Sequence, residues 1–211
     1  MKRTTRIFIG AVWIFAFTVW TLSVSLVDLE AIGPNGSFVG FASLNGYVHK
    51  LTGVNLTLYT VTDWLGLVPI AVALTFATLG LLQWIKRKSI SKVDKNIILL
   101  GGFYLFVMAA YLLFEGVVIN YRPILINGRL EPSYPSSTTM LVTCVMPTAV
   151  MQLRRRIKNK NLKRAIISII LAFTVFTVIG RLICGVHWFS DIVGGLLLSI
   201  GMVTIYQAIA F

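Results

Sequence analysis

A histidine and an aspartate four residues apart stand near the C-terminal end of the chain, where one long apolar segment ends and another begins. On a helix, His187 and Asp191 would share one face. A carboxylate beside an imidazole can hold one ring nitrogen and leave the other free as a nucleophile or a base. The pair therefore indicates nucleophilic or proton-transfer chemistry, although such a pair is also found as a structural contact at the start of a helix.

Two arginines and a glutamate accompany this pair. Arg181 lies six residues before His187, Arg122 follows the third long apolar segment, and Glu115 lies near the end of that segment. The planar guanidinium group of arginine matches the oxygens of a phosphate. Ionisable residues in or beside apolar segments are costly and are usually retained for function. The two arginines thus point to a phosphorylated substrate.

A short polar segment, Tyr-Pro-Ser-Ser-Thr-Thr at residues 134–139, precedes the fourth apolar segment. Pro135 and Ser136 are residue types that begin helices, so the first backbone N–H groups of the following helix would be free to bind an anion. The hydroxyl groups of Ser136, Ser137 and Thr138 would cap that helix or bind a phosphate. These two roles are compatible.

The composition shows which elements must position these residues. Of 211 residues, 57% are hydrophobic and only 12% are charged, which excludes an ordinary water-soluble surface. A helix needs roughly 20 residues to cross the ~30 Å hydrocarbon layer of a membrane. The apolar segments therefore predict an all-α fold, a bundle of six transmembrane helices that forms a single domain over residues 1–211. The predicted spans are Ile7–Val27, Leu65–Ile85, Ile97–Ile119, Ser136–Leu153, Ala165–Val186 and Ile192–Phe211.

Lysine and arginine are distributed unevenly among the predicted loops. Fifteen of the 19 lie before the first span or in the second and fourth loops, and only Lys50, Arg122, Arg129 and Arg181 lie on the other side. Because cytoplasmic loops collect positive charge, both termini are predicted to be cytoplasmic and the candidate site to face outward. We expect a bacterial plasma membrane. Topology and contacts to anionic lipid account for the net charge of +12, so no nucleic-acid partner is implied.

The first outer loop, Asp28–Trp64, is the longest predicted segment outside the spans. Its apolar residues recur at helical spacing, which predicts a short amphipathic helix in the outer headgroup layer. Such a helix would pack across the outer face of the bundle or cap a lipid-accessible site. It would also carry His49, the only histidine besides His187. The apolar residues are Phe38, Phe41, Leu44, Val48 and Leu51.

Taken in chain order, these motifs resemble the three signature motifs of the type 2 phosphatidic acid phosphatase superfamily, over about Leu65 to Phe211. Members of that family are integral-membrane lipid phosphatases with six spans and an outward-facing site that forms a covalent phosphohistidine. The matching residues are Arg122-Pro123, Pro135-Ser136-Ser137, and Gly180-Arg181 followed by His187 and Asp191.

The resemblance implies a role for each matching residue. His187 would attack phosphorus, and Asp191 would orient it. Arg122 and Arg181 would bind the phosphoryl oxygens of a phosphorylated membrane lipid, and Ser136 with the neighbouring amides would complete the cradle. The resemblance implies no metal and no other cofactor.

Two positions depart from the family pattern. Glu115 stands seven residues before Arg122, where the family has lysine, and Thr138 stands where the family has histidine. The family's usual general acid and one phosphate-binding cation are therefore missing. A general acid contributes roughly 10²–10⁴-fold to expulsion of a poor leaving group. A phosphate leaving group needs less help, because its second pKa is about 6. We therefore expect a lipid diphosphate substrate, such as undecaprenyl diphosphate.

Several residues are candidates for the missing roles. His49, Glu131 and Tyr134 are possible replacements for the general acid. Glu115 is expected either to pair with Arg122 or Arg129 or to repel a multiply charged phosphate.

Three other functions stay open on the sequence alone. A catalytically impaired relative would bind phosphorylated lipids without turnover, and a phosphotransferase would pass the phosphoryl group to an acceptor hydroxyl. A small transporter or channel is disfavoured, because the charged residues gather at one membrane face and do not line a path through the bilayer.

Overall fold

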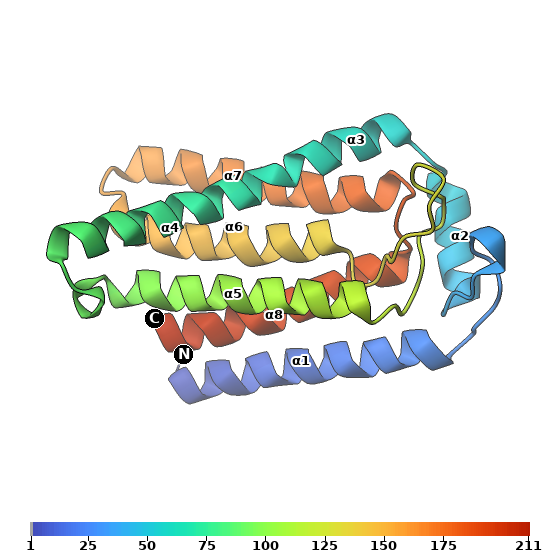
Figure 1. The fold of residues 1–211 in the computed structure, drawn as a ribbon, viewed down its shortest axis with the longest axis horizontal. Helices are drawn as coiled ribbons and strands as arrows, with labels where there is room; N and C mark the ends of the chain where they lie inside the picture. Colours follow the sequence, from blue (N-terminus) through green and yellow to red (C-terminus); the bar gives the residue numbers. More distant parts are fainter. Residues whose placement is uncertain (1) are drawn as a thin grey trace.

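The computed structural model describes residues 2–211 and consists of long helices that lie side by side along a common axis (Figure 1). Two 3-10 turns, Pro34–Gly36 and Ile90–Lys92, and three isolated β-bridges lie in the connections of the described chain. The prediction of an all-α fold is therefore confirmed. The helices are α1 (Arg3–Leu26), α2 (Ala42–Thr52), α3 (Leu56–Leu65), α4 (Leu67–Arg87), α5 (Lys95–Gly116), α6 (Ser137–Arg156), α7 (Lys160–Ile183) and α8 (Phe189–Ala210).

Five helical segments are long and apolar enough to cross a membrane: α1, α3 together with α4, α5, α7 and α8. The chain is thus a membrane protein. Helix α6 has 20 residues, but its polar side chains make it less apolar than the others. Thr139, Thr148 and Gln152 of α6 are fully buried, so the surrounding helices shield them from lipid. A sixth span formed by α6 remains a prediction.

The second span begins earlier than the sequence suggested. Helix α3 starts at Leu56, with Asn55 capping it, and runs through Gly66 into α4, so the helical segment that could cross a membrane is Leu56–Arg87, which contains the predicted Leu65–Ile85. The polar residues that suggested a loop are compatible with a helix. The hydroxyls of Thr60 and Thr62 donate to carbonyl oxygens one turn earlier in α3, which hides their polarity from the surroundings.

The two ends of the bundle differ in charge. Both termini, the α4–α5 connection and the α6–α7 connection lie at one end, which we call the basic end (Figure 1). The connections α1–α2, α5–α6 and α7–α8 lie at the other, which we call the site end. The fifteen lysines and arginines of the terminal segment and the second and fourth loops fall at or beside the basic end. The orientation of these ends in a cell membrane stays a prediction.

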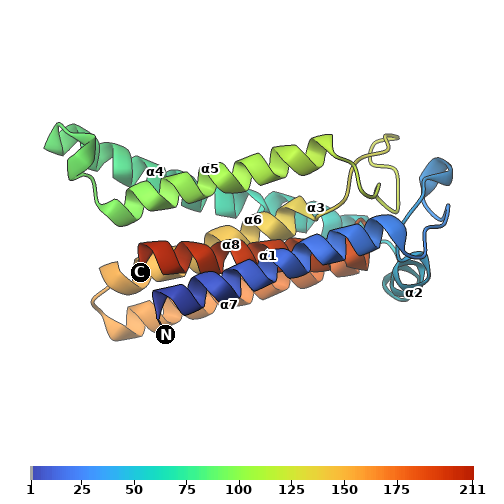
Figure 2. The ribbon, with the colours of Figure 1, turned by 90° about the horizontal axis from the view of Figure 1, so that it is seen from below.

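Helix α8 is the most enclosed of the five apolar spans. Half of its apolar window is buried, compared with less than a fifth for each of the others, because it packs against α1, α5, α6 and α7. Figure 2 shows α1 running along α8. Small residues permit this approach, since a Cβ at Gly201 would lie only 2.7 Å from the Ile14 side chain. This packing fixes the N-terminal end of α8, where Asp191 lies.

Helix α2 lies across the site end, at the position predicted for the helix of the first outer loop (Figure 1). Ala42 and Asn45 form its buried face. Leu44 and Leu51 are exposed, which suits contact with lipid. The location of α2 in the headgroup layer remains a prediction, but its contacts place a buried amide next to the start of α8.

Candidate active site

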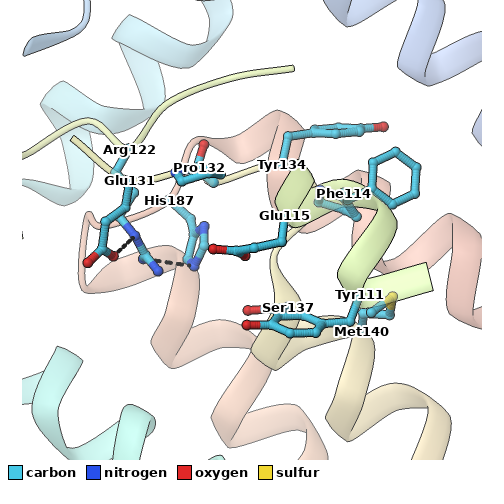
Figure 3. A pocket seen from close by; sticks show the side chains of 12 residues that line it. Tyr111, Phe114, Glu115, Arg122, Glu131, Pro132, Tyr134, Ser137, Met140 and His187 are labelled. Atoms are coloured by element: carbon cyan, nitrogen blue, oxygen red, sulfur yellow. Dashed lines mark hydrogen bonds and ion pairs between the residues drawn. The ribbon is translucent and has the colours of Figure 1, made fainter. Parts of the chain in front are cut away.

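A cavity of about 250 Å³ opens at the site end between α5, the α5–α6 connection and the start of α6 (Figure 3). Its polar lining includes Glu115, Arg122, Glu131, Ser137 and His187. The side chains of an aromatic pair on α5 and a methionine on α6 form an apolar part of the wall. These apolar residues are Tyr111, Phe114 and Met140.

His187 lies just before α8 and not within it, so the expected shared helix face is wrong. Trp188 is the N-cap and Phe189 the first helical residue. The contact with Asp191 nevertheless forms, because Asp191 turns back as a capping residue and its Oδ2 accepts a hydrogen bond from the Trp188 backbone N–H at 2.9 Å. This places Asp191 Oδ2 3.5 Å from His187 Nδ1, with both side chains buried.

Two guanidinium groups meet the other nitrogen of the ring. Arg181 Nη2 is 3.1 Å and Arg122 Nη1 is 3.3 Å from His187 Nε2. Guanidinium groups only donate, so Nε2 accepts, and the neutral ring carries its proton on Nδ1, facing Asp191. Burial, and then the positive charges of Arg122 and Arg181, lower the pKa of His187 well below its usual 6.5. The site therefore holds a neutral imidazole with a lone pair on Nε2.

Each arginine is held by an acidic residue. Arg181 is almost fully buried, its Nη1 lies 3.5 Å from Asp63 Oδ1 of α3, and its guanidinium lies over the Tyr59 ring. Arg122 Nε donates to Glu131 Oε2 at 3.1 Å within the α5–α6 connection. The Nε of Arg181 is buried without a partner in the described chain, so this guanidinium retains an unused donor. Arg122 lines the cavity, whereas Arg181 lies outside its lining and contacts the site through His187 Nε2.

Ser136 caps α6, as predicted. It is fully buried, and its Oγ accepts from the Thr139 backbone N–H at 3.4 Å. Its own N–H donates to the Asp191 backbone carbonyl at 3.0 Å. Ser136 therefore joins the start of α6 to the start of α8. Ser136 does not line the cavity, and its predicted contact with a phosphate stays a prediction.

The two residues after Ser136 point in different directions. Ser137 lines the cavity, and Thr138 does not. The methyl group of Thr138 faces the α3–α4 junction, where a Cβ at Gly66 would lie 3.6 Å from it. Ser137 thus lies at the cavity and Thr138 does not, and a phosphate contact of either residue stays a prediction.

Glu115 lies in the last turn of α5 and lines the cavity. The expected ion pair between Glu115 and Arg122 or Arg129 is wrong: within residues 2–211, the acidic partner of Arg122 is Glu131. Glu131 is close to Arg122 because the α5–α6 connection folds back on itself. The Arg122 backbone N–H donates to the Glu131 carbonyl oxygen, and a β-bridge pairs the residues next to them. Glu115 therefore has no ion-pair partner among residues 2–211.

Two of the candidate general acids have their hydrogen-bonding groups engaged elsewhere. His49 Nε2 lies 3.1 Å from the carbonyl oxygen of Gly185, and its ring packs against Trp188, behind the loop that carries the site histidine. Tyr134 lines the cavity, but its hydroxyl is bonded to Thr21 Oγ1 at 2.7 Å on α1. The third candidate, Glu131, is occupied by its ion pair with Arg122.

Sequence reasoning missed two buried amides that support the site. Asn120 Nδ2 lies 3.5 Å from Asp191 Oδ1 and 3.4 Å from Ser190 Oγ. Asn45 of α2 donates to Ser190 Oγ at 2.9 Å and accepts from the Ser190 N–H at 3.0 Å. The position of Asn120, two residues before Arg122, was an available signal. Asn45 had none, since a single amide adds nothing to the helical periodicity of the apolar residues that predicted α2.

The described residues contain no group of three or more His, Cys, Asp or Glu side chains arranged to hold a metal ion. The side chains that gather at the cavity are instead an imidazole, two guanidinium groups, hydroxyls and carboxylates.

The fold and the site together define a polytopic helical membrane protein whose buried histidine faces two guanidinium groups at a cavity. The family model of the PAP2 superfamily matches residues 101–211, which contain the site residues from Glu115 to Asp191. The chain belongs to the PAP2 superfamily. Its fold is similar to the crystal structure of a transmembrane PAP2-type phosphatidylglycerolphosphate phosphatase from Bacillus subtilis, with a TM-score of 0.62 and 17% sequence identity over 94% of this chain and 93% of that chain. No curated protein matches the sequence.

Proposed function

We propose that this chain is a lipid phosphatase that hydrolyses a phosphorylated membrane lipid through a phosphohistidine intermediate on His187. One observation carries the proposal: His187 Nε2 lies 3.1 Å and 3.3 Å from the guanidinium groups of Arg181 and Arg122, beside a cavity. The nucleophilic nitrogen thus lies beside two guanidinium groups, which are groups suited to bind phosphate oxygens. Membership of the PAP2 superfamily and the phosphatase identity of the structural neighbour support the same reaction class.

The arrangement explains how substrate binding would activate the nucleophile. Without a phosphate, the two guanidinium groups donate toward Nε2 and occupy its lone pair. Phosphoryl oxygens are stronger acceptors for these donors, so a bound phosphate would draw them away and free Nε2 to attack phosphorus. As the N–P bond forms, the bond to the leaving oxygen breaks and the ring becomes positively charged. Asp191, 3.5 Å from Nδ1, would stabilise that charge.

The leaving group favours a diphosphate. Thr138 lies outside the cavity lining, and the hydrogen-bonding groups of His49 and Tyr134 are engaged elsewhere. Without a general acid, the rate of alkoxide expulsion falls by roughly 10²–10⁴-fold. A phosphate is a better leaving group and depends less on such an acid. A lipid diphosphate such as undecaprenyl diphosphate is therefore the proposed substrate. The apolar wall of the cavity, formed by Tyr111, Phe114 and Met140, suits the lipid chain next to its headgroup.

The charge distribution supports the proposed location. The basic end carries most of the lysine and arginine residues, so it would face the cytoplasm of a bacterial cell. The site end, with the cavity, would then open at the outer surface of the plasma membrane. A phosphorylated lipid in the outer leaflet would reach the site from the side of the bundle.

The test is phosphate release from undecaprenyl diphosphate and from phosphatidic acid by detergent-purified protein. We expect faster release from the diphosphate and complete loss with His187→Ala. Faster release from phosphatidic acid would refute the substrate assignment. Binding of both lipids without any release would identify a phospholipid-binding relative, and transfer of phosphate to an added alcohol in place of water would identify a phosphotransferase.

A further inference from the structure

Glu115 enters the cavity from a different wall than the arginines. Its carboxylate projects from the last turn of α5 into the space that His187 also lines (Figure 3). Arg122 and Glu131 come from the α5–α6 connection on the other side of the imidazole (Figure 3). A phosphoryl group attached to His187 Nε2 would therefore have Glu115 on the cavity side and the arginines at its flank.

Glu115 also differs from the other carboxylates near the site in having no partner. Glu131 pairs with Arg122, Asp63 pairs with Arg181, and Asp191 accepts from the Trp188 N–H. Among residues 2–211, Glu115 forms no hydrogen bond or ion pair that would hold its carboxylate in one place. A carboxylate that is free within a cavity can accept a proton from a water molecule held there.

The proposed reaction needs such a group in its second half. Hydrolysis of a phosphohistidine requires a water molecule to approach phosphorus in line with the N–P bond, on the side opposite Nε2. His187 and Glu115 both line the cavity, so a water molecule held there can approach a phosphoryl group on His187 and lie beside the Glu115 carboxylate. The other candidate bases are engaged, since His49 contacts the Gly185 carbonyl and Tyr134 contacts Thr21.

We propose that Glu115 is the general base that activates this water, an inference that rests on the proposed phosphohistidine mechanism. The water oxygen forms a bond to phosphorus while the phosphorus–Nε2 bond breaks. The electron pair of the broken bond returns to Nε2 of His187. One proton of the water passes to the Glu115 carboxylate and then to solvent. The products are inorganic phosphate and neutral His187, with its proton on Nδ1.

The role explains why an acidic residue is useful in this position of the cavity despite its repulsion of phosphate. A carboxylate has no proton to give to a leaving group in the first step. With a diphosphate substrate that step needs little acid assistance. The carboxylate then contributes in the second step, when the leaving group has departed and water takes its place.

The experiment uses a lipid diphosphate that is labelled in its terminal phosphate. A rapid-quench assay follows lipid product, phosphoprotein and inorganic phosphate as the Glu115→Gln variant turns it over. We expect a burst of about one equivalent of lipid product, accumulation of base-stable phosphoprotein, and steady-state turnover lowered by about 10²–10⁴-fold. Glu115→Asp, which keeps the carboxylate, should recover part of the turnover. Glu30→Gln is the matched control, because it removes a negative charge from an exposed loop position at the site end and should leave turnover unchanged.

Two results would overturn the inference while leaving the phosphatase proposal intact. Faster turnover of Glu115→Gln without a phosphoprotein would show that the carboxylate only repels substrate. Slower release of lipid product, again without a phosphoprotein, would place Glu115 in the first step. Phosphate release by the wild-type protein without a phosphoprotein in any variant would instead refute the phosphohistidine mechanism, and the role of Glu115 with it.

Discussion

Replacement of Asp191 by asparagine tests how the site stabilises charge on its nucleophile. The substitution keeps the size of the side chain but removes its negative charge. Asp191 Oδ2 now accepts from the Trp188 N–H and faces His187 Nδ1 at 3.5 Å. An asparagine oxygen in the place of Oδ2 would keep the Trp188 bond and the contact with His187 Nδ1, while its NH₂ group would face the donating Nδ2 of Asn120. The substitution therefore mainly removes the negative charge beside the ring of His187.

The geometry sets the size of the expected effect. At 3.5 Å and an effective dielectric constant of about 20, a carboxylate stabilises a unit positive charge by about 5 kcal/mol. Each 1.36 kcal/mol corresponds to about tenfold in rate, so kcat should fall by about 10³–10⁴-fold. The imidazole becomes positively charged only as the N–P bond forms. The loss should therefore appear in kcat, with a small change in KM.

The assay is phosphate release from a lipid diphosphate, with the thermal unfolding of each variant measured in the same detergent. Asp63→Asn is the control, because Asp63 lies 3.5 Å from Arg181 but its side chain is 59% exposed. Water screens the exposed Asp63 carboxylate although Arg181 is buried, so this control should lose far less activity than Asp191→Asn. A folded Asp191→Asn protein that keeps kcat within tenfold of wild type would refute the charge-stabilising role.

Four further predictions follow from the contacts of the site. Arg181→Lys should lower kcat/KM by about 10–150-fold, because one ammonium cannot replace charge-assisted hydrogen bonds worth about 1.5–3 kcal/mol; equal rates would exclude a phosphate-binding role. The pKa of His187 is lowered by burial and by both arginines, so the acidic limb of kcat/KM that reports this group should lie below pH 6.5; a limb above 6.5 would contradict the assigned environment. The unfolded chain binds a proton at this residue more readily, so the same group should make folding stability fall as pH drops below 6.5. Asn45→Ala should lower the unfolding free energy by about 2–6 kcal/mol, since the Ser190 N–H and Gly40 carbonyl lose buried partners worth about 1–3 kcal/mol each; unchanged unfolding in denaturant would show that water replaces the amide.

The apolar pattern predicted most of the helices because a membrane requires long uninterrupted apolar segments. It failed where polar groups are satisfied inside a helix. Thr60 and Thr62 bond to their own helix, so the segment from Leu56 spans where a loop was predicted. Helix α6 carries Thr148 and Gln152 toward other helices, and its low hydropathy reflects that enclosure.

The sequence predicted the contact between His187 and Asp191, but the structure forms it in a different way. The four-residue spacing was taken as a helical face, whereas a capping turn brings the two side chains together. Local sequence favours both geometries, so spacing alone could not separate them.

Other site features depend on contacts between distant segments. Asn45 reaches Ser190 only because α2 folds across the start of α8. Whether Ser137 or Thr138 faces the cavity depends on how α6 is rotated in the bundle, which its neighbours decide. A single buried amide or hydroxyl leaves no periodic trace in a sequence, so these residues were beyond prediction.

The central claim is that His187 carries the phosphoryl group. The most direct measurement is to react the protein with a lipid diphosphate labelled in its terminal phosphate, stop the reaction in alkaline denaturant, and locate the label by mass spectrometry. The account predicts an acid-labile, base-stable phosphate on His187, more of it in Glu115→Gln, and none in His187→Ala. Undiminished phosphate release by His187→Ala, or a label on another residue, would contradict it.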